Sequence, residues 1–513
     1  MNVNVIDSLV LCSKGVSIPK EILSNEQEEN IKNELQAKPF SPPNSIQKKV
    51  EFPIYRESKK KLYVPRFYAL NWLNNHPDKT IHVKNIKKST LQESVKIQLE
   101  FKGDLRPYQE NIVSTYVKEA ERSGCGLLEI PCGRGKTVMA LNIISQLKKK
   151  TIVIVHKEFL LNQWVERIQQ FLPDATIGRI QGQTIDVEGK DIVIGMLQSL
   201  SMKEYDSSIF KEFGLTIVDE CHHISAEVFS RSLFKIVTEN MLGLSATMER
   251  KDNMTSVFKL FLGNVVYKEK RQGDDKVNVR ALHYNVDDEE YSQVVYNFKG
   301  QTHYSVMIKK LCEFNPRTEF ILKVLKDLLN EDGNESQHIM ILAHNKSVLK
   351  YLHDAIEHRN IASVGYYVGG MKEKDLKISE TKKVIIATYA MAEEALDIKT
   401  LSTLILATPK TDVTQAVGRI LRIKHNKPIV LDIVDQHGVF QNQWTKRRRF
   451  YSKCNYKIQE IDSREYQKDF EKWNIIYSPE TGRSRNRIKK PSLLNTNMCL
   501  IKIDTKTDTK TDN

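Results

Sequence analysis

The stretch Pro131-Cys-Gly-Arg-Gly-Lys-Thr137 decides how the rest of the sequence is interpreted. An apolar run, Leu127–Ile130, precedes it, and an amphipathic stretch, Val138–Leu147, follows it. The sequence therefore predicts a loop between a buried strand and a helix. The two glycines of the loop let the backbone turn its N–H groups toward an anion, and the helix N-terminus adds a favourable dipole. This pattern predicts a phosphate-binding P-loop, although Ile130 stands where the generic motif has glycine.

The side chains of this loop are candidates for nucleotide binding. Lys136 carries the positive charge that neutralises β- and γ-phosphates, and the Thr137 hydroxyl is a typical Mg2+ ligand. A chance Gly-Lys-Thr is the alternative, which the strand before the loop and the helix after it disfavour. The loop residues that we expect at the nucleotide are Ile130, Pro131, Cys132, Gly133, Arg134, Gly135, Lys136 and Thr137.

A pair of adjacent carboxylates, Asp219 and Glu220, follows the apolar run Leu215–Val218. Open parallel sheets bind ligands at the carboxyl ends of their strands, where this pair is expected to lie. One carboxylate can hold Mg2+ while the next orients and deprotonates an attacking water. We assign Asp219 to the metal and Glu220 to the water. A solvated acidic pair on the surface is the alternative, which the placement after a strand disfavours.

Short β-branched runs alternate with amphipathic stretches through the middle of the chain, which predicts an α/β fold with parallel strands and crossing helices. The expected strands are 127–130, 152–155, 191–194, 215–218 and 242–244, followed by a second series at 339–342, 384–387, 404–407 and 429–431. Leu161, Trp164 and Ile168 fall on one helical face, so Trp164 is expected in the core. The two series indicate two tandem domains, each a parallel sheet flanked by helices.

Composition and charge are those of a globular protein with a polyanionic partner. The chain has 513 residues, 40% hydrophobic and 28% charged, which excludes a mostly disordered protein. The formal net charge is +14, with a surplus of 5 cations in residues 1–100 and of 8 in 441–513, against 1 in 101–440. Basic flanks around a near-neutral centre suit arms that contact nucleic acid.

The seven cysteines are scattered and form no Cys-x-x-Cys pair. We therefore expect a reducing, intracellular compartment, with neither a disulfide framework nor a zinc site. No apolar stretch reaches the ~18 residues of a membrane helix, and Asp7 interrupts the apolar run near the N-terminus. Neither a membrane span nor a secretory signal is expected.

Shifts in composition predict the domain boundaries. The expected units are an accessory region over 1–95, a first α/β domain over 96–265, a linker over 266–310, a second α/β domain over 311–455, and a basic region with a disordered tail over 456–513. The basic stretches Lys446–Arg449 and Arg483–Lys490 are candidate phosphate contacts. For the second stretch, a disordered tail or a nuclear address is an equal alternative.

Further blocks occur in a fixed order around the P-loop. Leu105-Arg-Pro-Tyr-Gln109 precedes it, and Asp219-Glu-Cys-His222, Ser245-Ala-Thr247 and Gln415-Ala-Val-Gly-Arg-Ile-Leu-Arg422 follow it. Together these blocks resemble the motor core of the superfamily 2 DEAD/DEAH-like helicases. The P-loop, Gly195-Met-Leu-Gln-Ser199 and Arg447-Arg-Arg-Phe-Tyr451 are similar to those of one branch. That branch includes the xeroderma pigmentosum group B helicase, restriction-enzyme translocase subunits and the poxvirus transcript-release helicase. The compact accessory regions resemble those of a large DNA virus protein.

The resemblance implies two RecA-like domains that bind ATP and Mg2+ between them. Arg106 and Gln109 are then expected on the adenine side, and Asp397 at the ribose, although Ala395 stands where the family has glycine. Arg419 and Arg422 resemble arginine fingers, which would complete a catalytic set with Lys136 and Glu220. Solvated helix charges are the alternative for the two arginines. The residues expected to couple the two domains are His222, Ser245, Thr247 and Gln415.

Polar residues after the expected strands are expected to line a path for nucleic acid. These residues are His156, Lys157, Gln198, Ser199, Asn345, Lys346 and Thr388. Contacts with a phosphate backbone suit DNA and RNA alike, so the path itself does not distinguish the two polymers.

The resemblance implies an ATP-dependent helicase or translocase with DNA favoured over RNA and 3′-to-5′ movement. It suggests a monomer that works with the transcription machinery in viral transcription termination or transcript release, in the host cytoplasm or the virion. A P-loop ATPase that acts as a switch, and an RNA helicase without processive DNA unwinding, are the alternatives. Strong stimulation of the ATPase by nucleic acid would distinguish a motor from a switch. An inactive scaffold is disfavoured because Lys136, Glu220, Arg419 and Arg422 are all present.

Overall fold

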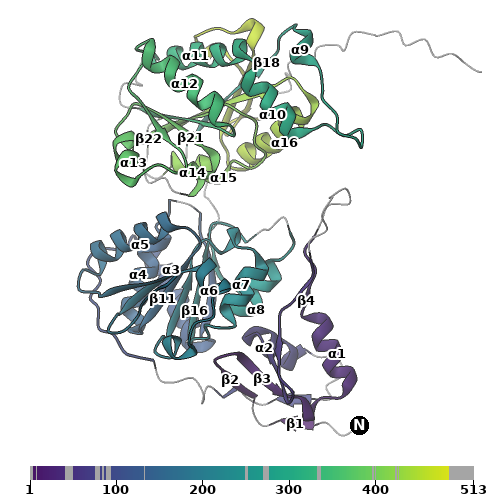
Figure 1. The fold of residues 1–513 in the computed structure, drawn as a ribbon. Coiled ribbons are helices and arrows are strands. Elements are labelled where there is room, and N and C mark those ends of the chain that lie inside the picture. Colours follow the sequence, from purple (N-terminus) through teal and green to yellow (C-terminus); the bar gives the residue numbers. More distant parts are fainter. Residues whose placement is uncertain are drawn as a thin grey trace, which may run out of the picture.

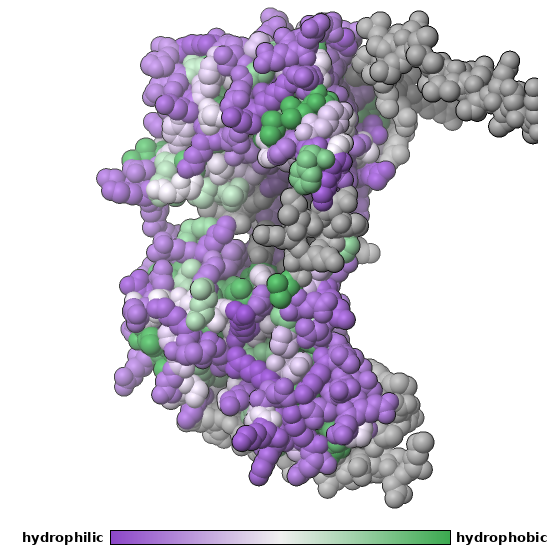
Figure 2. Space-filling view, turned by 45° about the vertical axis from the view of Figure 1, so that its right-hand side comes forward, coloured by the Kyte–Doolittle hydropathy of each residue, from purple (hydrophilic) through white to green (hydrophobic). Residues whose placement is uncertain are grey.

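The computed structural model has two α/β domains, one above the other in Figure 1, and a smaller N-terminal module beside the lower one. It describes residues 4–6, 9–40, 50–75, 81–83, 86–87, 94–131, 133–248, 252–269, 276–331, 337–394, 398, 400–421, 425 and 427–483. Among the helices in these ranges, none is both long and apolar enough to span a membrane. The surface in Figure 2 is mostly hydrophilic and is notched between the two domains.

The first domain is built on an eight-stranded sheet with the order β13-β12-β14-β11-β15-β16-β10-β17. All its neighbours pair in parallel except the edge hairpin β12–β13. The strands are β10 (Cys125–Glu129), β11 (Thr151–Val155), β12 (Ile177–Gln181), β13 (Thr184–Asp186), β14 (Ile192–Met196), β15 (Leu215–Val218), β16 (Asn240–Ser245) and β17 (Val265–Lys268). The helices are α3 (Pro107–Arg122), α4 (Lys136–Leu147), α5 (Glu158–Phe171), α6 (Leu197–Met202), α7 (Ala226–Leu233) and α8 (Thr255–Leu262).

The second domain is built on a nine-stranded sheet with the order β20-β21-β19-β22-β23-β18-β24-β25-β26. The strands are β18 (Asn278–Tyr284), β19 (His338–Ala343), β20 (Val364–Tyr367), β21 (Val384–Thr388), β22 (Leu401–Leu406), β23 (Ile429–Asp435), β24 (Lys457–Asp462), β25 (Asn474–Ser478) and β26 (Gly482–Arg483). The helices are α9 (Glu289–Ser292), α10 (Tyr304–Glu313), α11 (Asn315–Leu329), α12 (Lys346–His358), α13 (Glu373–Glu380), α14 (Tyr389–Glu394), α15 (Thr414–Arg419) and α16 (Gly438–Lys453). The strands from β20 to β24 pair in parallel.

The central strands are buried on both faces, which explains their continuous apolar runs. Along β10, Leu127 packs with the α6–α8 side of the sheet and Leu128 with the α3–α5 side. Each strand expected in the two series is present, and the prediction of two tandem α/β domains is confirmed.

The stretch expected as a linker, 266–310, instead contains strand β18 in the interior of the second sheet, where it pairs with β23 and β24. The second sheet also extends through β24 to β26, beyond the expected boundary at 455. The sequence did not predict β18 because this strand contains a charged residue, Arg280. Its side chain is 1% exposed, forms two 2.6 Å contacts with Glu331, and lies 4.1 Å from the ring centroid of Phe470.

The N-terminal module packs directly on the first domain. It contains β1 (Asn4–Ile6), β2 (Leu9–Cys12), β3 (Gly15–Pro19), α1 (Asn25–Glu34), β4 (Gln36–Ala37), β5 (Phe52–Pro53), β6 (Arg56–Glu57), β7 (Lys61–Val64), α2 (Arg66–Asn75), β8 (Ile81–Val83) and β9 (Ile86–Lys87). Its apolar side chains join those under α7 and α8 in one cluster. The buried Arg66 donates from Nη1 to the Glu239 carbonyl at 2.9 Å. The module is therefore continuous with the first domain rather than a separate arm.

Candidate nucleotide and coupling site

The P-loop follows β10 and leads directly into α4. Gly133 and Gly135 have φ of 83° and 80°, in the left-handed region that favours glycine. A Cβ at Gly135 would lie 2.4 Å from Gln109 Nε2, so a larger residue here would displace the Gln109 side chain. Ile130 N donates to the Ser245 carbonyl at 2.8 Å, which ties the start of the loop to the end of β16. Cys132 lies outside the described residues.

Gln109 holds the loop from the start of α3. Its Nε2 donates to the Arg134 carbonyl at 3.0 Å, and its Oε1 accepts from the backbone N–H of Arg106 at 2.9 Å. Of the two residues expected on the adenine side, Gln109 therefore contacts the P-loop backbone, and Arg106 contacts Gln109 through its backbone N–H.

The Arg134 side chain has partners that the sequence did not indicate. Its guanidinium lies 4.3 Å from the ring centroid of Tyr108, and its Nε donates to Glu269 Oε1 at 2.8 Å. Glu269 directly follows β17 and leads out of the first domain. The P-loop is therefore tied to the end of the first domain by a salt bridge.

Asp219 lies at the carboxyl end of β15 and is buried. One carboxylate oxygen accepts from the indole N–H of Trp164 at 2.9 Å, and the other accepts from the Glu220 backbone N–H at 2.9 Å. Burial, and then the neighbouring charge of Glu220, raise the pKa of the Asp219 carboxyl above its usual range. A cation beside this carboxylate would favour its charged form. Trp164 is in the core as predicted, but its hydrogen bond to Asp219 was not predicted.

Glu220 adopts a left-handed backbone conformation, with φ of 48°. This conformation is unfavourable for a residue with a Cβ, and such strained residues are enriched at functional sites. Its Oε1 lies 2.7 Å from Lys136 Nζ, so the carboxylate at the end of β15 and the ammonium of the P-loop form an ion pair. Lys136 and Glu220 are thereby brought together with Asp219 and Thr137 around one edge of the sheet.

His222 connects these residues to the second domain. Its Nε2 lies 2.8 Å from the Gln415 side-chain nitrogen on α15, and its Nδ1 lies 2.9 Å from Ser245 Oγ and 3.3 Å from Glu220 Oε2. The Ser245 hydroxyl in turn donates to the Thr247 carbonyl. The residues predicted to couple the two domains therefore form one chain of contacts. A second contact between the domains joins Lys377 on α13 to Glu166 on α5, at 3.4 Å.

Arg419 is buried at the end of α15, on the same helix as Gln415. In Figure 1, α14 and α15 lie at the end of the second domain that faces the first domain. Arg422 and Asp397 lie outside the described residues.

The residues expected on a nucleic-acid path lie at strand ends in both domains. Gln198 is exposed and donates to the His156 carbonyl at 2.8 Å, while Ser199 Oγ accepts from the Gly182 N–H at 2.9 Å. His156 itself is buried, so Gln198 and the half-buried Lys157 present the polar side chains at this edge. In the second domain, Asn345 and Lys346 follow β19 and Thr388 ends the adjacent β21.

The basic stretch Lys446–Arg449 differs from its expected role at one position. Arg447 is 1% exposed, and its guanidinium forms two contacts with the fully buried Asp432, at 2.7 and 2.8 Å. This arginine is therefore structural, and only its neighbours can contact a phosphate. The sequence does contain a signal for the burial of Arg447. Its spacing from Trp444 and Tyr451 places all three residues on one face of α16, which is the buried face.

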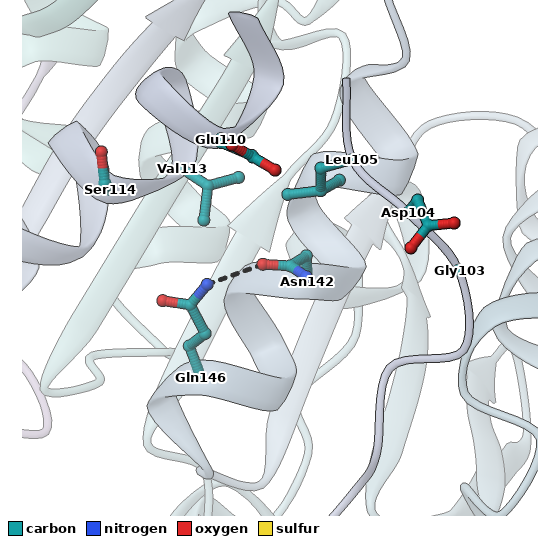
Figure 3. Close-up of a pocket in the computed structure, with 8 residues that line it drawn as sticks. All are labelled: Gly103, Asp104, Leu105, Glu110, Val113, Ser114, Asn142 and Gln146. Carbon is teal, nitrogen blue, oxygen red and sulfur yellow. Dashed lines mark hydrogen bonds between the residues drawn. The ribbon is translucent and has the colours of Figure 1, made fainter. Parts of the chain in front are cut away.

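A cavity of about 450 Å³ lies elsewhere, between the segment 103–105 and helices α3 and α4 (Figure 3). Glu110, Asn142 and Gln146 line it, and Gln146 donates to Asn142 Oδ1 at 2.7 Å. None of the P-loop residues that the structure describes lines this cavity, so it is distinct from the predicted nucleotide site.

The donor set around the P-loop fits a nucleotide with its metal. The left-handed glycines orient a loop at the N-terminus of α4, Lys136 supplies a cation, and Thr137 and Asp219 supply the oxygen ligands that Mg2+ prefers. Of the residues that the structure describes, no His, Cys, Asp and Glu side chains form a group of three or more that could hold a metal alone.

Comparisons with known proteins give the family. Residues 102–250 match the family model described as "Type III restriction enzyme, res subunit". A protein of Acanthamoeba polyphaga mimivirus, named as an ATP-dependent RNA helicase, is 33% identical over 472 residues, which cover 90% of this chain and 88% of that protein. The DNA 3′-5′ translocase XPB2 of Sulfurisphaera tokodaii is 25% identical, over 71% of this chain and 90% of the translocase.

Among solved structures, Dbp5 of S. cerevisiae bound to RNA and ADP-BeF3 matches 70% of this chain and 90% of its own, with a TM-score of 0.50 and 13% identity. That likeness concerns the fold alone. The fold and the relatives together define an ATP-hydrolysing helicase with two RecA-like domains. The chain belongs to the superfamily 2 helicases, and its relatives include proteins of large DNA viruses.

Proposed function

We propose that this helicase uses ATP hydrolysis to translocate along nucleic acid, with DNA as the favoured polymer and 3′-to-5′ as the direction. The observation that carries the proposal is the hydrogen bond between His222 and Gln415. This bond connects the second domain with His222 of the first domain. His222 lies two positions after Glu220, the carboxylate assigned to water activation. Relative motion of the two domains would therefore change the surroundings of that carboxylate.

Bound ATP with Mg2+ would supply the phosphoanhydride whose cleavage drives translocation. The following residues of the chain are proposed to bind the nucleotide and its metal. We assign Thr137 and Asp219 to the metal, and Trp164 to orienting Asp219 through its indole N–H. Lys136 neutralises phosphate charge, and Arg106 and Gln109 hold the adenine side. Asp397 is proposed at the ribose, and Arg419 and Arg422 as the arginines that stabilise charge during phosphoryl transfer.

Glu220 is proposed as the base that accepts a proton from the attacking water. Its ion pair with Lys136 at 2.7 Å must open before Lys136 can turn to a phosphate group. Opening of this pair leaves the Glu220 carboxylate without its cation and thus available to accept a proton. The ion pair therefore restrains the base until a polyphosphate is in the loop.

Nucleic acid is proposed to cross the carboxyl edges of both sheets. Lys157, Gln198 and Ser199 would contact it from the first domain, and Asn345, Lys346 and Thr388 from the second. The name of the S. tokodaii relative, a DNA 3′-5′ translocase, supports DNA and the direction. The name of the mimivirus relative, an RNA helicase, supports RNA as the second candidate.

The relatives from large DNA viruses support a role inside an infected cell, and we propose transcription termination or transcript release as the process. The transcription machinery is then the partner, and the motor works as a monomer.

Displacement of streptavidin from biotinylated oligonucleotides tests the proposal. Movement from 3′ to 5′ displaces streptavidin from the 5′ end in an ATP-dependent manner and leaves it at the 3′ end. Matched DNA and RNA strands distinguish the two candidates. ATP turnover without displacement from either polymer would instead indicate a switch.

A further inference from the structure

The segment between α9 and α10 carries two of the most exposed aromatic side chains that the structure describes. Tyr296 is 61% exposed and Phe298 is 83% exposed. In Figure 1 this segment stands out from the body of the second domain. Two exposed aromatic side chains grouped on one segment present apolar surface that a ligand can cover.

The segment is an ordered hairpin with a defined turn. Asn297 N donates to the Gln301 carbonyl at 2.7 Å, and Gly300 N donates to the Asn297 carbonyl at 2.9 Å. Asn297 Oδ1 accepts from the backbone N–H groups of Lys299 and Gln301, at 2.9 and 3.0 Å. Gly300 has φ of 69°, which the turn requires. The turn therefore holds the aromatic side chains at a fixed tip.

The root of the hairpin lies at the carboxyl edge of the second sheet. The Tyr304 hydroxyl donates to the Pro409 carbonyl at 3.2 Å and accepts from Gln443 Nε2 at 3.1 Å. Pro409 is next to Thr408, whose hydroxyl accepts from the His344 backbone N–H at 3.0 Å at the end of β19. Asn345 and Lys346, proposed to contact nucleic acid, directly follow His344. The hairpin thus projects from the same edge as the proposed path.

The charge of the hairpin suits a polyanion. Residues 293–303 contain Lys299 and no Asp or Glu. Lys299 Nζ lies 5.7 Å from the ring centroid of Phe298, so a cation and an exposed ring share the tip. An aromatic face with a neighbouring cation is the combination with which proteins stack on bases of single-stranded nucleic acid.

We infer that the 293–303 hairpin is a base-stacking element in which Phe298, supported by Tyr296, contacts an unpaired base of the bound nucleic acid. Stacking tolerates any base and either sugar, so the contact is expected with single-stranded DNA and RNA alike. This inference rests on the proposed function, since it requires that the chain binds nucleic acid.

The test measures binding of the full chain to single-stranded DNA and RNA oligonucleotides that carry 2-aminopurine, whose fluorescence reports stacking. We expect Phe298→Ala to weaken binding on the order of tenfold, and the double variant with Tyr296→Ala to weaken it further. Phe298→Trp is expected to retain binding. Phe298→Leu, which keeps apolar area without an aromatic face, is expected to behave like Phe298→Ala.

Phe40→Ala is the matched control, because Phe40 is an aromatic side chain, 49% exposed, in the N-terminal module. It is expected to bind like the unaltered chain. Unchanged affinity and fluorescence in Phe298→Ala would overturn the inference while nucleic-acid binding itself stands, as would full affinity in Phe298→Leu. Failure of the unaltered chain to bind either polymer would overturn the proposed function and this inference with it.

Discussion

The side-chain nitrogen of Gln415 in the second domain lies 2.8 Å from His222 Nε2 in the first. The other ring nitrogen, Nδ1, lies 2.9 Å from Ser245 Oγ and 3.3 Å from Glu220 Oε2. One imidazole therefore connects the second domain with the end of β16 and with the proposed catalytic carboxylate.

Loss of this contact is expected to uncouple the domains. Gln415→Ala removes one hydrogen bond, worth ~1 kcal/mol, so nucleic-acid-stimulated turnover is expected to fall about fivefold while ATP still binds. Steady-state kcat with saturating polymer measures the effect. His222→Ala combined with Gln415→Ala is expected to be no worse than His222→Ala alone, and additive losses would show that the two residues act independently.

Glu220→Gln is expected to bind ATP and to hydrolyse it very slowly, because an amide cannot accept the proton of the attacking water. Loss of the charged partner also releases Lys136 from its 2.7 Å ion pair, so ATP affinity is expected to be equal or higher. A filter-binding assay and single-turnover hydrolysis separate the two effects. Hydrolysis at the unaltered rate would refute the assignment of Glu220.

Gly135→Ala is expected to weaken ATP binding by about tenfold, because its φ of 80° is unfavourable for a residue with a Cβ. The added Cβ, 2.4 Å from Gln109 Nε2, would also displace that side chain from the Arg134 carbonyl. Gly182→Ala is the control, because its φ of 60° imposes a similar backbone strain away from the P-loop. It is expected to bind ATP like the unaltered chain, and unchanged ATP affinity in Gly135→Ala would contradict the role of the loop.

Trp164→Phe is expected to raise the Mg2+ concentration needed for half-maximal turnover by about tenfold, because it removes the N–H that orients Asp219. Trp473→Phe is the control, since Trp473 Nε1 also makes one hydrogen bond, to the Gln467 carbonyl at 3.1 Å, in the second domain. A Mg2+ titration of the ATPase activity compares the two variants. An unchanged Mg2+ requirement in Trp164→Phe would show that Trp164 does not orient the metal ligand Asp219.

Arg447→Met is expected to destabilise the second domain by about 3–5 kcal/mol, because it leaves Asp432 buried without its cation. The exposed Arg449, two positions away on the same helix, provides the comparison. Arg449→Ala is expected to change the free energy of unfolding by less than about 0.5 kcal/mol. Denaturant unfolding of the two variants measures this difference, and equal stabilities would contradict the structural role of Arg447.

The sequence predicted the parts of the fold that depend on periodic apolar patterns. The buried parallel strands and the P-loop between β10 and α4 lie where they were expected. Strand β18 was missed because Arg280 interrupts its apolar pattern, and the partner that makes burial possible, Glu331, lies far along the chain. The basic composition of Lys446–Arg449 likewise did not show that Arg447 forms a buried ion pair with Asp432, although the spacing of Arg447 from Trp444 and Tyr451 on α16 indicates a buried position.

For the site, the sequence identified residue types but not their contacts with one another. Helical periodicity placed Trp164 in the core without showing that its indole N–H reaches Asp219. The ion pair of Arg134 with Glu269 joins residues 135 positions apart, and no local pattern encodes it. Such partners depend on sheet order, which becomes known only when the chain is folded.

Translocation driven by ATP is tested by steady-state ATPase activity with and without single-stranded DNA, duplex DNA and RNA, with Lys136→Ala as the control for turnover at this P-loop. We expect nucleic acid, and DNA most of all, to stimulate strongly an activity that Lys136→Ala abolishes. Turnover that depends on Lys136 but is indifferent to all three polymers would refute translocation and indicate an ATP-driven switch.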